Sequence, residues 1–137
     1  MPDIKHITRD ELQRLLTDME VDPIVDSEGA LYCVLPADDD FPHDVVFHFT
    51  HDDDGWFGIE AIADEFNLTE EEVGPALLFC NEFSRRARIP KAFVQNGRYK
   101  LDQWIVFPAS TDDDYIKQYI ELVITMCWSF FVNANRK

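Results

Sequence analysis

Cysteine, glycine and basic residues are all scarce in this chain of 137 residues. Its three cysteines, Cys33, Cys80 and Cys127, are odd in number and widely spaced within apolar sequence. That spacing fits neither a zinc knuckle nor a redox pair, so we expect buried free thiols in a reducing compartment. With only five glycines and no glycine-rich loop, the sequence offers no phosphate-binding motif.

Long apolar runs are absent as well. No segment is long enough to cross a bilayer, and residues 1–6 lack the pattern of a signal peptide. A chain of this length can bury roughly two-thirds of its unfolded surface as one domain. We therefore expect a single cytoplasmic domain over residues 1–137, with no association with membranes.

Positive charge is the third shortage. Twelve basic residues face twenty-seven acidic ones, for a net charge of −15, and such a surface repels the phosphates of nucleic acids. The acids crowd into residues 38–40, 52–54, 70–72 and 112–114, whereas residues 83–101 contain none. That acid-free stretch holds half of all the basic side chains: Arg85, Arg86, Arg88, Lys91, Arg98 and Lys100.

Helices are predicted at three places by their capping and periodicity. Thr8 and Glu11 have the spacing of a capping box before a helix over residues 9–19. Thr69 and Glu72 repeat it, and we expect a short turn there and a helix that begins at Pro75, where proline is tolerated. Residues 111–114 repeat the capping pattern before a long apolar helix that reaches about residue 132.

Strands are predicted from β-prone runs separated by turn residues. They cover residues 24–25, 30–35, 45–50, 56–62, 91–95 and 98–107. Asn96 and Gly97 suit a type I′ turn in the last hairpin. The order α-β-β-β(β)-α-β-β-α indicates an α+β fold in which three helices pack on an antiparallel sheet.

The stretch over residues 81–107 carries a family resemblance. Asn81 lies near the end of the second helix, Pro90 and Lys91 start a strand, and a final hairpin follows. In this pattern the chain resembles the YbjN family of small bacterial proteins. The resemblance implies a fold similar to that of type III secretion chaperones, a role as a sensory transduction regulator, and homodimers such as those chaperones form.

Catalytic and metal-binding motifs do not emerge. We find no nucleophile elbow and no convincing Cys/His pair, and the paired carboxylates lie in caps and turns. His48 and His51, followed by Asp52–Asp54, are three apart on a strand and so face opposite sides, which disfavours a metal site. We expect no cofactor, no metal and no enzymatic activity.

Two groups of side chains are candidates for binding a partner protein. Arg85 and Arg88 share a helix face and, with Lys91 and Arg98, could dock an acidic segment, or could simply cap the helix and pair with the protein's own acids. The second group comprises aromatic residues that line a sheet face or a groove, or else belong to the core: Trp56, Phe93, Tyr99 and Trp104.

The last helix is a candidate dimer interface. Met126, Trp128 and Phe131 cannot all face one core together with their apolar neighbours, so the helix is either enclosed within the domain or presents an outer face to a second copy. The sequence thus favours a non-enzymatic cytoplasmic regulatory or chaperone-like domain that binds a protein or peptide, with an acidic segment as one candidate. A structural dimerisation module is the alternative.

Overall fold

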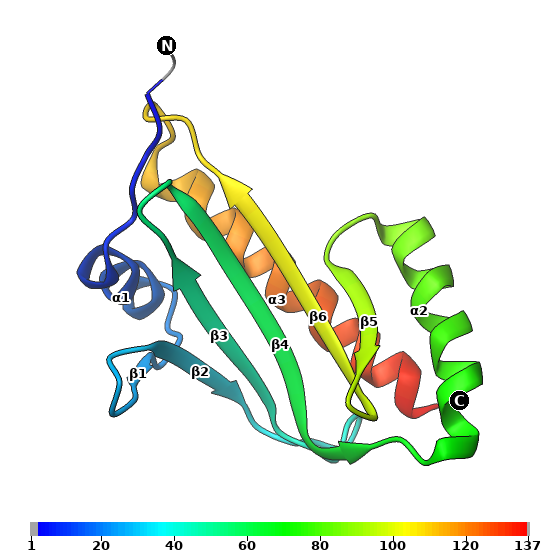
Figure 1. Cartoon of the computed structure of the whole chain (residues 1–137). Coiled ribbons are helices and arrows are strands. Elements are labelled where there is room, and N and C mark those ends of the chain that lie inside the picture. Colours follow the sequence, from blue (N-terminus) through cyan, green and yellow to red (C-terminus); the bar gives the residue numbers. More distant parts are fainter. Residues whose placement is uncertain (1–2, 137) are drawn as a thin grey trace.

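A computed structural model describes residues 3–136 (Figure 1). Six strands form one antiparallel sheet in the order β1-β2-β3-β4-β6-β5, accompanied by three α-helices, which confirms the predicted α+β fold. The elements are α1 (Arg9–Asp18), β1 (Ile24–Val25), β2 (Leu31–Leu35), β3 (Val45–His51), β4 (Trp56–Asn67), the 3₁₀ helix η1 (Glu70–Glu72), α2 (Val73–Ala87), β5 (Lys91–Gln95), β6 (Arg98–Val106) and α3 (Asp113–Asn135).

The helices lie on one side of the sheet. Helix α3 runs across that face, and both other helices contact it (Figure 1). Ion pairs of 3.2 Å between Arg14 and Asp113 and 3.4 Å between Lys117 and Asp18 join α1 to α3. On the other flank, the rings of Phe83 in α2 and Phe130 in α3 are 5.0 Å apart. The opposite face of the sheet is bare of helices within the described residues (Figure 1).

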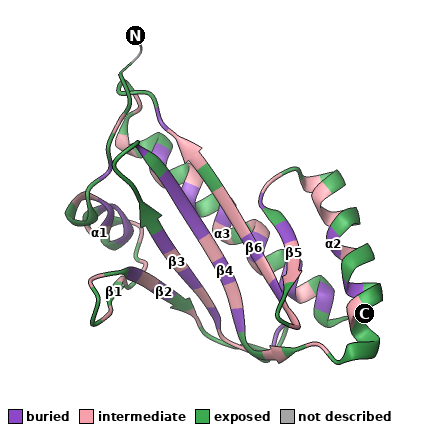
Figure 2. Cartoon of the chain, viewed as in Figure 1, coloured by how far each residue is buried: buried purple, intermediate pink, exposed green. Residues whose placement is uncertain are grey.

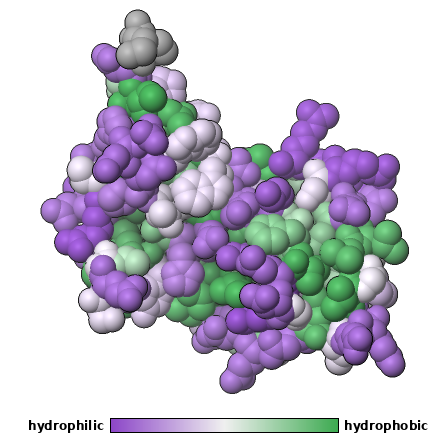
Figure 3. All heavy atoms as spheres, in the orientation of Figure 1, coloured by the Kyte–Doolittle hydropathy of each residue, from purple (hydrophilic) through white to green (hydrophobic). Residues whose placement is uncertain are grey.

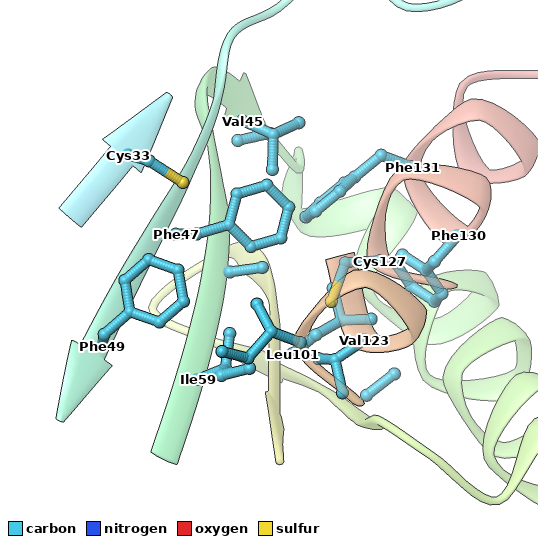
Figure 4. Packing of buried hydrophobic residues seen from close by; sticks show 14 of the residues in the cluster. Cys33, Val45, Phe47, Phe49, Ile59, Leu101, Val123, Cys127, Phe130 and Phe131 are labelled. Carbon is cyan, nitrogen blue, oxygen red and sulfur yellow. The ribbon is translucent and has the colours of Figure 1, made fainter. Parts of the chain in front are cut away.

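The core lies between the sheet and α3. Alternate strand residues point to this side because side chains alternate across a strand. Phe47 pairs with Ala61 and Ala61 with Leu101 in the sheet register, so three neighbouring strands present apolar side chains in one row. Cys127 and Phe131 of α3 meet this row, and all five residues are buried (Figures 2 and 4).

The predicted start of α1 is confirmed. The Thr8 hydroxyl accepts a hydrogen bond of 3.1 Å from the Glu11 amide, which satisfies one of the amides left unpaired at a helix N-terminus. Leu12, Leu15 and Leu16 are buried at the helical spacing that the sequence predicted.

Helix α2 begins two residues earlier than predicted. The capping box of Thr69 and Glu72 forms, but η1 leads straight into α2 at Val73 rather than at Pro75. Pro75 is accommodated because amides in the first turn have no partner within the helix. The helix ends at Ala87, followed by Arg88 at φ 67° and a cis peptide bond before Pro90.

Strand β4 extends five residues beyond the predicted end at residue 62. Its pairing with β6 is interrupted by a register shift between Ile62 and Asn67, where Glu65 takes a φ of 59°. The Arg98 guanidinium donates a hydrogen bond to the Ala63 carbonyl inside this irregularity. An arginine of the neighbouring strand thus replaces a ladder bond that the shift removes.

The last hairpin and last helix follow the prediction closely. Asn96 and Gly97 have φ values of 55° and 74°, as a type I′ turn requires. Helix α3 runs three residues past its predicted end at residue 132. Its cap is Asp112, whose carboxylate accepts a hydrogen bond of 2.8 Å from the Tyr115 amide.

Candidate partner-binding surfaces

The face of the sheet opposite the helices is the first candidate surface, called the open sheet face below. Sheet register brings Trp56 beside Val106, Gly58 beside Trp104 and Phe93 beside Lys100. Figure 3 views the molecule from the same side as Figure 1, and green and white atoms interrupt its hydrophilic surface. The apolar and aromatic members of the face are Tyr32, Val34, Val46, His48, Trp56, Ile62, Phe93 and Trp104.

Trp56 and Trp104 dominate this surface. They are 45% and 39% exposed, which is unusual for tryptophan side chains in a folded domain. Three of the four predicted aromatic binding residues, Trp56, Phe93 and Trp104, therefore point to the same side of the sheet.

Charged side chains of both signs lie on the open sheet face, with Glu60 beside Asp102 in the sheet register. The Lys100 ammonium lies 3.2 Å from the Glu60 carboxylate and donates a hydrogen bond of 3.3 Å to the Gln95 side chain. The Lys91 ammonium lies 5.5 Å from the centre of the Phe93 ring, within the range of a cation–π contact. The face thus combines aromatic surface with cations on its β5 side.

The predicted basic site is divided between several roles. Arg85 and Arg86 approach the carboxylate of Glu82 at 2.8 and 3.7 Å, so both pair within their own helix. Arg98 is held at the irregularity in β4. Arg88, directly after α2, is exposed, and its side chain has no ion pair with any other described residue.

Tyr99 does not join the open sheet face, which corrects its grouping with the other three aromatic residues. It points to the helix side, is only 6% exposed, and packs its ring 5.1 Å from that of Phe130. Burial raises the pKa of its hydroxyl to about 12, and charges at Cys80 and Glu72 add to the rise. Side chains alternate between the two sides of a strand, so Tyr99 lies on the same side of β6 as the buried Leu101, two residues away.

The proposed dimer residues of α3 separate in a similar way. Phe131 is 0% exposed and its ring lies 5.6 Å from that of Phe41, so it belongs to the core and not to an outer face. Trp128 is half-buried, with its ring 5.8 Å from that of Phe41, and Met126 is half-buried too. The more exposed large hydrophobic residues on this helix are Tyr115 and Leu122.

A second concavity lies between α2 and the C-terminal end of α3, called the α2–α3 groove below. Its volume is about 980 Å³. Phe66, Leu68 and Tyr99 line it together with residues of α2 and residues 133–135 of α3. No local sequence pattern predicts this groove, because its lining comes from five separate elements, β4, η1, α2, β6 and α3, that only the tertiary fold brings together.

Three free thiols lie in the core. Cys33, Cys80 and Cys127 are buried and unbonded, as predicted. Burial raises the pKa of Cys33 to about 12 and that of Cys80 to about 11, and it raises the pKa of Cys127 further still. Thiols with raised pKa values are poor nucleophiles and poor metal ligands at neutral pH.

Two further searches cover the described part of the chain. No group of three or more His, Cys, Asp or Glu side chains in residues 3–136 is placed to hold a metal ion. Over the same residues, none of the helices has the length and apolarity that crossing a membrane requires.

Comparison with known proteins identifies the family. The sequence model of YbjN, described as "Putative bacterial sensory transduction regulator", matches residues 8–133. The crystal structure of YbjN from E. coli, titled as that of "a putative transcription regulator", superposes with a TM-score of 0.71 at 14% identity, covering 98% of this chain and 96% of that one. A search of curated proteins found no match. Because the family model spans nearly the whole chain, this protein belongs to the YbjN family.

Proposed function

We propose that this protein is a non-enzymatic regulatory domain that binds a segment of a partner protein on its open sheet face. The family description, that of a regulator, supports a binding role over a catalytic one. The single observation that carries the proposal is the aromatic character of a face that no helix covers within the described residues.

The open sheet face differs from an ordinary solvated face. An antiparallel sheet with one side in water normally places polar residues on that side. Here Trp56, Trp104 and Phe93 lie on it, together with Val34 and Ile62. Exposed apolar surface is typical of interaction sites, and tryptophan is enriched among the residues that dominate binding energy.

The charges indicate what such a segment looks like. Arg88, Lys91 and Lys100 lie at or near the β5 side of the face, in a molecule whose net charge of −15 repels acidic partners elsewhere. We infer a segment with apolar or aromatic side chains and neighbouring Asp or Glu residues. It binds on the face rather than by adding a strand to β5, because the Ala92 amide already donates to the Ser84 hydroxyl of α2 at 3.3 Å.

Site-specific photocrosslinking tests the proposal. A photoreactive phenylalanine replaces Trp104 in one variant and Leu122, on the exposed side of α3, in the other. We expect crosslinks to one recurrent protein segment from position 104 in cells of the source organism, and none to that segment from position 122. Equal crosslinking from both positions, or none from position 104, would contradict the proposal.

A homodimer formed through α3 is the second candidate, because that helix exposes apolar residues. Leu122 is 47% exposed and Tyr115 is 54% exposed, seven residues apart and therefore on one side of the helix. Met126, one turn beyond Leu122, extends the row. Analytical ultracentrifugation of the wild type and of Leu122→Glu tests it: a dimer that the substitution dissociates supports this interface, and a monomeric wild type at high micromolar concentration contradicts it.

A further inference from the structure

The α2–α3 groove lies on the helix side of the sheet, away from the open sheet face. Phe66, Leu68 and Tyr99 form its floor, and Leu78 of α2 lies on its wall. Leu78 is 70% exposed, more than any other large apolar side chain in the described residues. A ligand that filled only the floor would leave this side chain in water.

The groove follows the axis of α2. Its lining residues on that helix recur at spacings of three and four, which place them on one face: Pro75, Leu78, Phe79, Glu82, Phe83 and Arg86. The fifteen residues of α2 span about 22 Å. The lining residues of α2, from Pro75 to Arg86, cover about 17 Å of that length. A groove of this length beside a helix, with both apolar and polar lining, resembles the grooves that receive a second, amphipathic helix.

Charge differs between the two ends of the groove. Toward the C-terminal end of α2, Glu82 and Arg86 form an ion pair of 3.7 Å. At the N-terminal end of α2, Glu71 and Glu72 have no lysine or arginine partner within the described residues. The Glu72 carboxylate accepts a hydrogen bond of 2.9 Å from the Thr69 amide, which helps lower its pKa and keeps it ionised.

The end of α3 also lines the groove, through residues 133–135. The last turn of the helix contains no basic residue, and Arg136 follows it as the C-cap. The carbonyls at a helix C-terminus carry a partial negative charge that favours cations. On the floor, the Tyr99 hydroxyl forms no hydrogen bond with another described residue, so a polar group of a ligand could pair with it.

We propose that the α2–α3 groove binds an amphipathic helix of a partner protein, with leucine-like side chains on one face and lysine or arginine at the end beside Glu71 and Glu72. The exposed Leu78 favours a helix over a small molecule, because only a larger ligand covers the wall as well as the floor. A basic segment fits this groove better than a second copy of this acidic chain does, because Glu71 and Glu72 place uncompensated negative charge at the groove itself.

Fluorescence polarisation with a defined probe tests this inference. The probe is a labelled helical peptide of about four turns, made of leucine, alanine and lysine with the leucines on one face. Its control is a scrambled peptide of the same composition and charge, which reports the general attraction of a cation to this acidic protein. We expect the amphipathic peptide to bind at least about tenfold more tightly than the scrambled one.

Three variants locate the binding. Leu78→Glu should weaken binding of the amphipathic peptide at least about tenfold although it adds a negative charge, because an apolar contact on the wall of the groove is lost. Glu71→Lys should weaken binding as well, and Val25→Glu, at an exposed apolar residue of β1 outside the groove, should not. Equal binding of the two peptides, or unchanged affinity in Leu78→Glu, overturns the inference. Weakening by Trp104→Ala instead would assign the peptide to the open sheet face and overturn it too.

Discussion

The indole of Trp104 lies flat against the backbone of Gly58, its direct neighbour across β4 and β6. A Cβ atom added at Gly58 would come within 2.6 Å of the ring, closer than such contacts occur. An aromatic side chain that covers a glycine on the neighbouring strand is a known device for stabilising sheets. The glycine thus leaves room for the Trp104 ring to lie on the open sheet face.

Gly58→Ala should displace the Trp104 ring. We expect it to lower the free energy of unfolding by about 1–3 kcal/mol, because the ring must move from a packed position. Urea denaturation measures the loss, and tryptophan emission, with Trp56 and Trp128 replaced by phenylalanine, reports the new environment of the ring.

A matched glycine serves as the control for that substitution. Gly74 lies in the first turn of α2, and nothing lies within 4 Å of the position of an added Cβ. Gly74→Ala should therefore raise the free energy of unfolding by up to about 1 kcal/mol. A neutral or stabilising effect of Gly58→Ala would show that Trp104 does not depend on the glycine.

Arg98→Ala should destabilise the protein although arginine is usually a surface residue. The substitution leaves the buried Ala63 without its hydrogen-bond donor in the irregular part of β4, and we expect a loss of about 1–3 kcal/mol. Arg88→Ala, in the same basic stretch but with no ion pair among the described residues, should change stability by less than about 0.5 kcal/mol. Similar losses in the two variants, measured by urea denaturation, would contradict a structural role for Arg98.

The buried thiols predict a pH dependence. Cys33 and Cys80 have an ordinary pKa of 9.0 when unfolded, raised in the fold to about 12 and about 11. Between these values the unfolded chain has released protons that the folded protein retains, so folding becomes less favourable as pH rises. The contribution of the two thiols to the free energy of unfolding should be complete below pH 9. It should be lost as the pH rises through their pKa values in the folded protein.

Alanine substitutions isolate that contribution. Cys33→Ala and Cys80→Ala should each flatten the decline in the free energy of unfolding above pH 9, whereas any loss of packing should be the same at every pH. Denaturant titrations from neutral pH upward measure both effects. An unchanged slope in both variants would show that the thiols ionise normally in the fold.

Much of this fold could be predicted because local rules and global packing agree. The capping pair Thr8 and Glu11 and the turn Asn96–Gly97 each specify a local geometry through side-chain or backbone chemistry. The extension of β4 could not be predicted, because residues 63–67 contain Asp, Glu and Asn, which are poor strand formers. Tertiary contacts, including that of Arg98, hold this stretch in the sheet.

The candidate surfaces were only partly predictable. Alternation along a strand predicts that Trp104 and Leu101 face opposite sides of the sheet. It does not predict which of the two sides the helices cover, and for that reason Tyr99 was grouped with the wrong face. Phe131 was misplaced because α3 is apolar around much of its circumference, so its sequence does not define a single inward face. The α2–α3 groove depends on how five elements meet, which no local pattern encodes.

Calorimetry on a selected peptide tests the central claim most directly. Peptides enriched from a random display library against the wild-type protein are titrated into wild type, the double variant Trp56→Ala with Trp104→Ala, and Leu122→Ala. We predict apolar peptides with acidic neighbours whose affinity falls at least about tenfold in the double variant and is unchanged in Leu122→Ala. If the double variant binds them as tightly as the wild type does, the open sheet face is not the binding surface.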